Sequence, residues 1–284
     1  MDSKTELELK DFSENLLNIR HGYTSRFSVK AETQKFIHGI LQLLFPHYSE
    51  HVYYSGEEIV SKMQLLQRDF KFILRSMSKN DTIEESKADA FFRAIPEINS
   101  KLWQDAEFIY KGDPAAEDVD EIILSYPGFF AIAVYRFAHE IYKIGIPKIP
   151  RIMTEYAHQL TGVDINPGAE VGTPFFIDHG TGIVIGETSR IGDRVKIYQG
   201  VTLGALSVDK KLMNVKRHPT IEDDVVIYAQ AVILGGDTVI GHNSIIGGNV
   251  WLTQSVPAFS VVYHKSEVKV RDNGNYEEPV DFVI

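Results

Sequence analysis

An aliphatic residue recurs at almost every sixth position between Asp164 and Trp251, and this period limits the folds open to the chain more than any other feature. The recurring positions, with one slip at Ser189, are Ile165, Val171, Ile177, Ile183, Val195, Val201, Ile221, Ile227, Ile233, Val239, Ile245 and Trp251. Small residues lie beside or between them, as in Val171-Gly172, where a chain must turn a tight corner. Such a hexapeptide repeat is the signature of a parallel β-helix.

Each six-residue unit predicts one short strand and one corner, with a single inward aliphatic side chain that stacks on the units above and below. A lone unit cannot bury its apolar face, so stability requires several stacked coils, as in other solenoids. At three units per coil, the repeat predicts roughly five or six coils. An antiparallel sandwich is the alternative, but it would show a period of two within its strands.

The first part of the chain follows helical spacing instead. Apolar residues three and four positions apart, beginning with Leu9, Phe12 and Leu16, indicate amphipathic helices. We predict helices near residues 9–19, 36–45, 59–77, 88–109, 127–141 and 148–161. The segment that opens with Pro127 is apolar nearly all round, so its helix must be covered on several sides.

These patterns predict an α+β chain in three parts. Residues 1–162 form an all-helical domain, residues 163–265 a parallel β-helix and residues 266–284 a flexible, acidic and polar tail. The net charge of -10 and the lack of a long basic run argue against nucleic-acid binding.

The acidic, polar first residues contain no apolar segment, which argues against a secretory signal or a membrane span. With no cysteine in the 284 residues, disulfides, thiolate ligands and a cysteine nucleophile are excluded. We therefore expect a cytoplasmic protein.

His179 is a candidate general base, because histidine can be neutral near pH 7 and can take a proton from a substrate hydroxyl. Asp164 lies fifteen residues earlier, close to one full coil, which would place it at the adjacent level near the same corner. Its carboxylate could then hold the imidazole tautomer and stabilise the imidazolium, as in hydrolase triads. The alternative for each residue is a corner side chain satisfied by backbone hydrogen bonds.

Several segments together resemble the serine O-acetyltransferases. They are residues 112–115, the helix with Tyr135-Arg136, and residues 163–169, 176–188, 200–205 and 216–219, which include Asp178-His179-Gly180-Thr181-Gly182 and Arg217-His218-Pro219. The resemblance covers roughly residues 110–262. It implies the acetyl-CoA-dependent enzyme that opens cysteine biosynthesis, a left-handed β-helix and no metal.

The resemblance assigns the base and its acidic companion the roles given above. It also implies that Asp178, assisted by Asp113, accepts the amino group of the bound amino acid, and that His218 helps to bind the substrate. Arg217 could bind the carboxylate of the bound amino acid through its planar guanidinium. The alternative is a surface salt bridge for Asp113 and Arg217 and a purely structural role for His218.

Acetyl-CoA should lie in a groove between neighbouring solenoids, where small residues let the pantetheine arm approach the backbone. The candidates are Gly204, Ala205, Ala229 and Gly247. A backbone N–H near Gly204 is our candidate donor to the developing oxyanion. Alternatively, these are corners that need small residues. The segment 205–216 is longer than the usual loop of the family and lacks its glycines; its lysines could meet phosphates or form a solvated charge cluster.

The resemblance further implies a trimer, or a dimer of trimers, with sites between subunits, and L-cysteine as a competing inhibitor. The terminal Ile284 is similar to the peptide by which this family binds O-acetylserine sulfhydrylase, since a free carboxylate can be captured by backbone N–H groups. A frayed end with chance aliphatic residues is the alternative.

Three other functions stay open. A hexapeptide acetyltransferase could act on another hydroxyl, such as homoserine or a sugar. A γ-type carbonic anhydrase would need three histidine ligands, and no near-spaced pair exists among His179, His218, His242 and His264. A non-catalytic scaffold could bind a partner through the tail.

Overall fold

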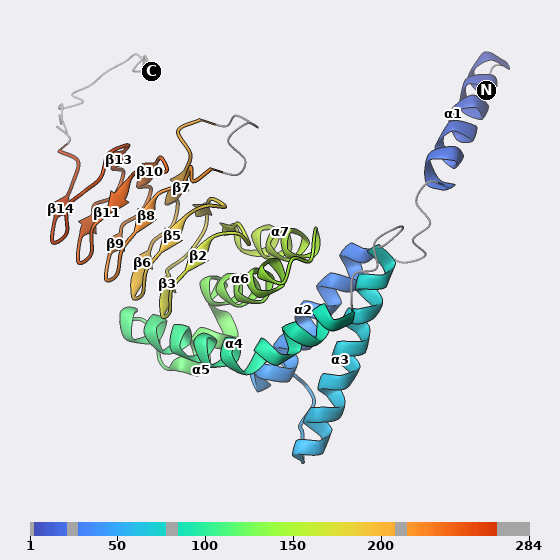
Figure 1. Ribbon diagram of the computed structural model, residues 1–284, viewed down its shortest axis with the longest axis horizontal. Coiled ribbons are helices and arrows are strands. Elements are labelled where there is room, and N and C mark those ends of the chain that lie inside the picture. Colours follow the sequence, from blue (N-terminus) through green and yellow to red (C-terminus); the bar gives the residue numbers. More distant parts are fainter. Residues whose placement is uncertain (1–2, 22–27, 78–84, 208–214, 266–284) are drawn as a thin grey trace, which may run out of the picture.

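In a computed structural model, the chain forms a helical N-terminal part followed by a parallel β-solenoid (Figure 1). The structure describes residues 3–21, 28–77, 85–207 and 215–265. The helices are α1 (Ser3–His21), α2 (Val29–Leu44), the 3₁₀ helix η1 (Pro46–Tyr48), α3 (Gly56–Met77), α4 (Glu85–Gly112), α5 (Val119–Ser125), α6 (Pro127–Lys143) and α7 (Ile149–Thr161). The predicted helices are all present. Sequence analysis missed η1 and α5, which are too short to show a helical period.

Capping residues set the limits of several helices. The side chain of Ser28 accepts from Ala31 N–H at the start of α2, and Asp118 does the same for Glu121 N–H at the start of α5. Gly162 ends α7 with a left-handed φ of +73°, which glycine adopts without strain, and its N–H donates to His158. The chain therefore leaves the last helix directly into the first coil.

Within the described residues, fourteen short strands build the three faces of the solenoid. They are β1 (Asp164–Ile165), β2 (Glu170–Val171), β3 (Phe175–Ile177), β4 (Val184–Ile185), β5 (Arg190–Ile191), β6 (Val195–Ile197), β7 (Thr202–Gly204), β8 (Thr220–Ile221), β9 (Val226–Ile227), β10 (Val232–Leu234), β11 (Val239–Ile240), β12 (Ile245–Ile246), β13 (Trp251–Leu252) and β14 (Val261–Val262). Sheet A has the order β1-β4-β7-β10-β13, sheet B β2-β5-β8-β11 and sheet C β3-β6-β9-β12-β14. Neighbouring strands pair in parallel, for example β3 with β6, which confirms the predicted parallel β-helix.

Two side chains per unit point inward, rather than the single one predicted. In β6, for example, both Val195 and Ile197 are fully buried. The inward side chains of successive coils therefore form two buried stacks. The predicted series follows the first stack as far as Ile177, changes to the second at Ile183, and returns to the first at Ile221. The apparent slip at Ser189 is a buried position of the second stack, only 1% exposed.

The last three predicted inward positions, Val239, Ile245 and Trp251, are wrong. The side chains of Ile245 and Trp251 are 39% and 67% exposed, and Val239 is partly exposed beside the fully buried Ile240. The step between buried positions lengthens from six to seven residues between Ile233 and Ile240. Because side chains alternate between the two faces of a strand, one extra residue turns the expected side chain outward.

A buried ion pair fixes the helices to the first coil. Arg136 of α6 donates to Asp105 of α4 from Nε at 2.5 Å and from Nη2 at 2.7 Å. Arg136 also donates to Gly172 O, and Asp105 accepts from Phe175 N–H at the start of β3. Burial raises the pKa of the Asp105 carboxyl, and the Arg136 charge opposes that rise. The helix α6 is buried on several sides, as its sequence predicts.

Among the described residues, no single helix has the length and apolarity needed to cross a membrane. The pair α5 and α6 would meet these criteria only as a span bent by 75°. The predicted tail over 266–284, including Ile284, lies outside the described residues, as do residues 208–214 of the long segment between β7 and β8. The division of the chain into three parts stays a prediction.

Candidate active site

Asp178 and His179 form the corner between β3 and β4. Asp178 N–H donates to Ile197 O at 3.1 Å, so the next coil holds the start of this corner. The φ of His179 is +54°, but Arg194 and Gln230 at other corners have similar values, so this backbone is a property of corners. Nδ1 of His179 lies 3.7 Å from Oδ1 of Asp178, and the imidazole is 71% exposed. The imidazole is therefore open to a substrate.

Asp113 reaches the same corner from the end of α4. Its Oδ2 accepts from the Tyr126 hydroxyl at 2.6 Å, and its Oδ1 accepts from Ala115 N–H at 2.8 Å. These two hydrogen bonds, and to a lesser extent the charge of His179, lower the pKa of the Asp113 carboxyl. Two carboxylates and one imidazole of the same chain thus gather at one corner.

The carboxylate of Asp164 is paired with Arg151 of α7. Nη1 of Arg151 lies 3.0 Å from Oδ1 of Asp164, and Nη2 lies 3.5 Å from Oδ2. Within the described part of the chain, Asp164 and His179 share no hydrogen bond. The reason lies in the register, because the residue one level above Asp164 is Val184. The role of Asp164 as the orienting carboxylate stays a prediction.

Glu155, His158 and Asp164 offer possible metal ligands within 4.8 Å of one another. The guanidinium of Arg151 pairs with both carboxylates, at 2.5 Å from Glu155 and 3.0 Å from Asp164. A cation of the protein itself therefore already balances this acidic group, and we assign no metal to it.

Arg217 and His218 lie at a different corner, between sheets A and B. The guanidinium of Arg217 pairs with Glu187. The Thr188 hydroxyl accepts from the N–H groups of Arg217 and His218 at 2.9 and 3.1 Å, and donates to Nδ1 of His218 at 2.8 Å. A Cβ at Gly186 would lie 1.9 Å from Cδ2 of His218, so only glycine fits there. The hydrogen bonds to Thr188 and the close packing on Gly186 therefore hold the His218 imidazole in one orientation.

The four small residues predicted to face acetyl-CoA are divided between these two kinds of corner. Gly204 ends β7 and Ala205 follows it, between sheets A and B, whereas Ala229 and Gly247 follow β9 and β12, between sheets C and A. A Cβ at Gly204 would lie 2.8 Å from Cδ2 of Leu234, so a larger residue there would require the Leu234 side chain to move. A single chain does not bring the four together.

Comparison with known proteins identifies the family. A serine acetyltransferase, described as plasmid, from Synechococcus elongatus is 43% identical over 265 residues, which span 85% of this chain and 82% of that protein. The chain belongs to the serine acetyltransferase family.

Solved members of the serine acetyltransferase family share the fold. Serine acetyltransferase 1 of Entamoeba histolytica, in complex with L-cysteine, has a TM-score of 0.74 at 37% identity, covering 80% of this chain and 86% of that one. The Neisseria gonorrhoeae enzyme, in complex with serine, has a TM-score of 0.57 at 25% identity, covering 84% of this chain and 96% of that one. No protein-family model matches the chain.

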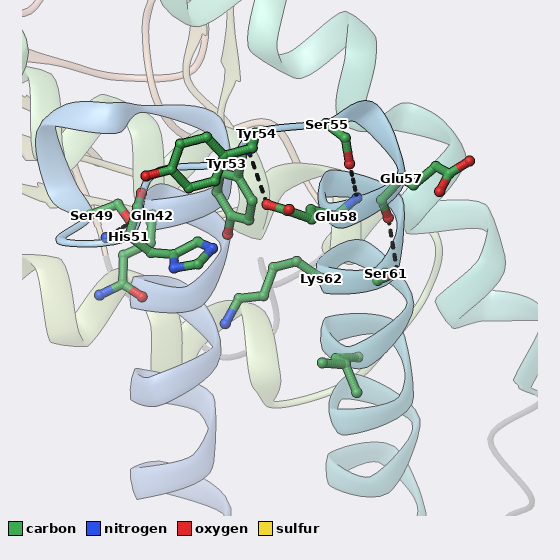
Figure 2. Close-up of a pocket in the computed structure, with 11 residues that line it drawn as sticks. Gln42, Ser49, His51, Tyr53, Tyr54, Ser55, Glu57, Glu58, Ser61 and Lys62 are labelled. Carbon is green, nitrogen blue, oxygen red and sulfur yellow. Dashed lines mark hydrogen bonds between the residues drawn. The ribbon is translucent and has the colours of Figure 1, made fainter.

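A cavity of about 760 Å³ lies between α2 and the start of α3, away from the His179 and Arg217 corners (Figure 2). Figure 2 shows Lys62 extending between the two helices and Glu58 accepting from Tyr54 N–H. None of the predicted site residues lines this cavity. Two smaller cavities, of about 430 and 340 Å³, share Tyr142 and Glu187 beside the Arg217 corner. We place the candidate site at the corners because the acid, base and guanidinium groups lie there.

Sequence analysis missed four residues that hold the site residues in place. They are Tyr126, Arg151, Glu187 and Thr188. Glu187 and Thr188 lie within a segment that carries the family resemblance. Glu187 pairs with Arg217, thirty residues later, and Thr188 binds Arg217 and His218, twenty-nine and thirty residues later. The long segment between β7 and β8 hides this one-coil relation, because it makes that coil longer than the period predicts.

Lowering the pH should destabilise the fold through His218. Burial, and then the charge of Arg217, lowers the pKa of this imidazole from 6.5 to about 4. Between these pH values the unfolded chain binds more protons, so the free energy of unfolding falls as the pH falls from 6.5 towards 4. His218→Asn, which keeps an acceptor for Thr188, should lose this part of the pH dependence. Urea unfolding from pH 7.5 to pH 4.5 measures it, and identical pH slopes for both proteins would contradict the assignment.

Proposed function

We propose that the protein transfers the acetyl group of acetyl-CoA to the hydroxyl of L-serine, giving O-acetylserine and CoA. The observation that carries this proposal is the 43% identity to the Synechococcus elongatus serine acetyltransferase over 85% of the chain. The chemistry of the His179 corner supports it, because an exposed imidazole flanked by two carboxylates can bind an amino group and accept a hydroxyl proton.

Serine is a zwitterion and needs opposite charges at its two ends. The carboxylates of Asp113 and Asp178 accept hydrogen bonds from the ammonium group, which places the serine hydroxyl beside His179. Arg217 holds the carboxylate with its planar fork, and His218 supports this end of the substrate. Since Glu187 pairs with Arg217 in the free chain, the substrate carboxylate has to share or replace that partner.

The two halves of this binding site belong to different subunits. Asp178 and His179 lie between sheets C and A, whereas Arg217 and His218 lie between sheets A and B, with a strand of sheet A between the two corners. A second copy that brings its Arg217 corner against the His179 corner completes one amino-acid site. Repeated around a closed ring, this head-to-tail contact gives the trimer, which pairs into a hexamer if the helical parts associate.

His179 acts as the general base in the transfer. Its neutral imidazole takes the serine hydroxyl proton while the serine oxygen attacks the thioester carbonyl, and the imidazolium then returns the proton to the leaving thiolate. Asp164 stabilises the imidazolium once the assembled site frees its carboxylate from Arg151. A backbone N–H near Gly204 of the neighbouring subunit donates to the oxyanion.

Acetyl-CoA supplies the activated acetyl group, and we place it between neighbouring solenoids. Small residues at the two kinds of corner support this position, because the groove between two copies is the place where both can meet one ligand. The residues are Gly204 and Ala205 of one copy with Ala229 and Gly247 of the other. L-cysteine, which is bound in the Entamoeba histolytica structure, competes with serine for the same charged groups.

The purified protein should release CoA thiol from acetyl-CoA only when L-serine is added. Homoserine, which has one more methylene, should show a kcat/KM lower by about 10- to 200-fold, because its hydroxyl is displaced from His179. L-cysteine should raise the apparent KM for serine without changing kcat. A continuous thiol assay measures all three effects. Equal rates without serine, or a higher kcat/KM for homoserine or a sugar, would contradict the assignment.

A further inference from the structure

Two tyrosines stand directly above Asp178 on the outside of the solenoid. The strands β3, β6 and β9 pair in register at Ile177, Ile197 and Ile227. The residues that follow these three in the chain are Asp178, Tyr198 and Tyr228. Three successive coils therefore present a carboxylate and two phenol rings at the same corner, in vertical order.

The two tyrosines belong to a ladder of four aromatic rings, Phe108, Phe176, Tyr198 and Tyr228. Phe108 of α4 meets the fully buried Phe176 edge to face, with 6.2 Å between the ring centroids. Phe176 and Tyr198 are 5.8 Å apart, and Tyr198 stacks on Tyr228 at 5.1 Å and 18°. The ladder thus begins on a helix and holds the outer ring of Tyr228 in a defined orientation.

The solenoid does not need an aromatic ring at the position of Tyr228. In the next coil, Ile246 is the register partner of Ile227, so the equivalent position above Tyr228 is Gly247. The corner therefore closes without a side chain at this level. Tyr228 remains 44% exposed in the chain, so its ring contributes a surface rather than a part of the core.

The ladder connects the two ends of the proposed site. Burial, then Tyr228 and then the charges of Asp178 and Asp113 raise the pKa of the Tyr198 phenol, so Tyr198 lies within reach of the carboxylates that we assign to the amino group. At the other end, Tyr228 directly precedes Ala229, which we assign to the donor groove. The stacked rings therefore stand between the level of Asp178 and the start of the proposed donor groove at Ala229.

We propose that the stacked pair Tyr198–Tyr228 forms a rigid wall beside the acyl group of the donor and restricts transfer to short acyl chains. This inference rests on the acetyl transfer proposed above. The methyl of an acetyl group fits against a flat ring, whereas each added methylene needs the volume that the Tyr228 ring fills. Because Tyr228 is clamped through Tyr198 to the buried Phe176, the ring cannot turn aside without losing its stacking partner.

The test compares acetyl-CoA, propionyl-CoA and butyryl-CoA as donors to serine in wild type, Tyr228→Ala and Tyr228→Phe. Tyr228→Ala should raise the kcat/KM for butyryl-CoA relative to acetyl-CoA by about 10-fold or more, because the removed ring makes room for two methylenes. Tyr228→Phe keeps the ring and should keep the wild-type ratio. Tyr198→Leu, which removes the support of Tyr228, should shift the ratio in the same direction by a smaller factor.

Tyr263→Ala is the matched control. Tyr263 follows Val262, the register partner of Ile246, so it stands at the same corner beyond Gly247 and outside the ladder, and it is 74% exposed. Its removal should leave the donor ratio unchanged. An unchanged ratio in Tyr228→Ala and Tyr198→Leu, or an equal change in Tyr263→Ala, overturns the inference. If wild type shows no serine-dependent thiol release, the proposed function itself fails, and the two failures are thereby distinguished.

Discussion

Replacing His179 with alanine is expected to lower kcat for serine acetylation by about 100- to 10,000-fold, the range that a positioned general base contributes. Stability should not change, because the imidazole is 71% exposed and its ion-pair partner, Asp178, lies 3.7 Å away. Initial rates of thiol release at saturating serine measure the first effect. The melting temperature by circular dichroism measures the second.

His242→Ala is the matched control for this substitution. His242 is also a solvent-exposed solenoid histidine beside a carboxylate, with Nδ1 at 3.0 Å from Glu222 and 47% of its side chain exposed, but it lies on a higher coil, away from Asp113 and Asp178. Its removal should leave kcat within about twofold of wild type. A His179→Ala protein that kept more than about a tenth of the activity would exclude His179 as the base.

The same variant tests the division of the site between two copies. Chains with His179→Ala and chains with Arg217→Ala should each be inactive alone. Mixed during expression, they should recover about a quarter of the wild-type activity, because random assembly joins an intact His179 corner to an intact Arg217 corner at about one interface in four. Inactivity of the mixture, when mixed oligomers have been purified, would place both corners of a working site in one chain.

The sequence predicts the solenoid well because burial imposes the period directly. Each unit must place apolar side chains inside, and the spacing of those side chains is visible without any knowledge of contacts. The register is harder to predict. Two buried stacks lie two residues apart, and an aliphatic residue fits either one, so Ile183 and Ile221 appear to continue one series when they belong to different stacks. One added residue before Ile240 then turns Ile245 and Trp251 outward.

The candidate site divides in the same way. Asp178 and His179 are neighbours in the chain, and their shared corner follows from the repeat alone. The pairing of Asp164 with Arg151 depends on where α7 packs against the first coil, and no local pattern encodes that contact. The stacking of Tyr198 on Tyr228 depends on the register across a coil of irregular length. Local chemistry was therefore predictable, whereas contacts between distant residues needed the structure.

Removing the carboxylate of Asp105 should destabilise the fold more than any surface substitution. Asp105→Ala leaves the guanidinium of Arg136, only 6% exposed, without its ion-pair partner and leaves Phe175 N–H without its acceptor. Breaking a buried pair from one side costs about 3–5 kcal/mol, so the free energy of unfolding should fall by that amount. Urea unfolding at pH 7.5, followed by circular dichroism, measures it. Asp105→Asn keeps an acceptor oxygen for Phe175 and should cost less.

Glu107→Ala provides the control on the same helix. Glu107 pairs with Lys111 at 3.3 Å, but both side chains are more than half exposed, so its loss should cost at most about 0.5 kcal/mol. Arg136 and Asp105 also hydrogen-bond to the first coil, at Gly172 and Phe175. The Asp105 substitution should therefore loosen the contact between the helices and this coil. That contact positions Asp113, at the end of α4, beside the His179 corner. Asp105→Ala should therefore raise the KM for serine as well as lower stability. Equal costs for Asp105→Ala and Glu107→Ala would show that the buried pair does not hold the two parts together.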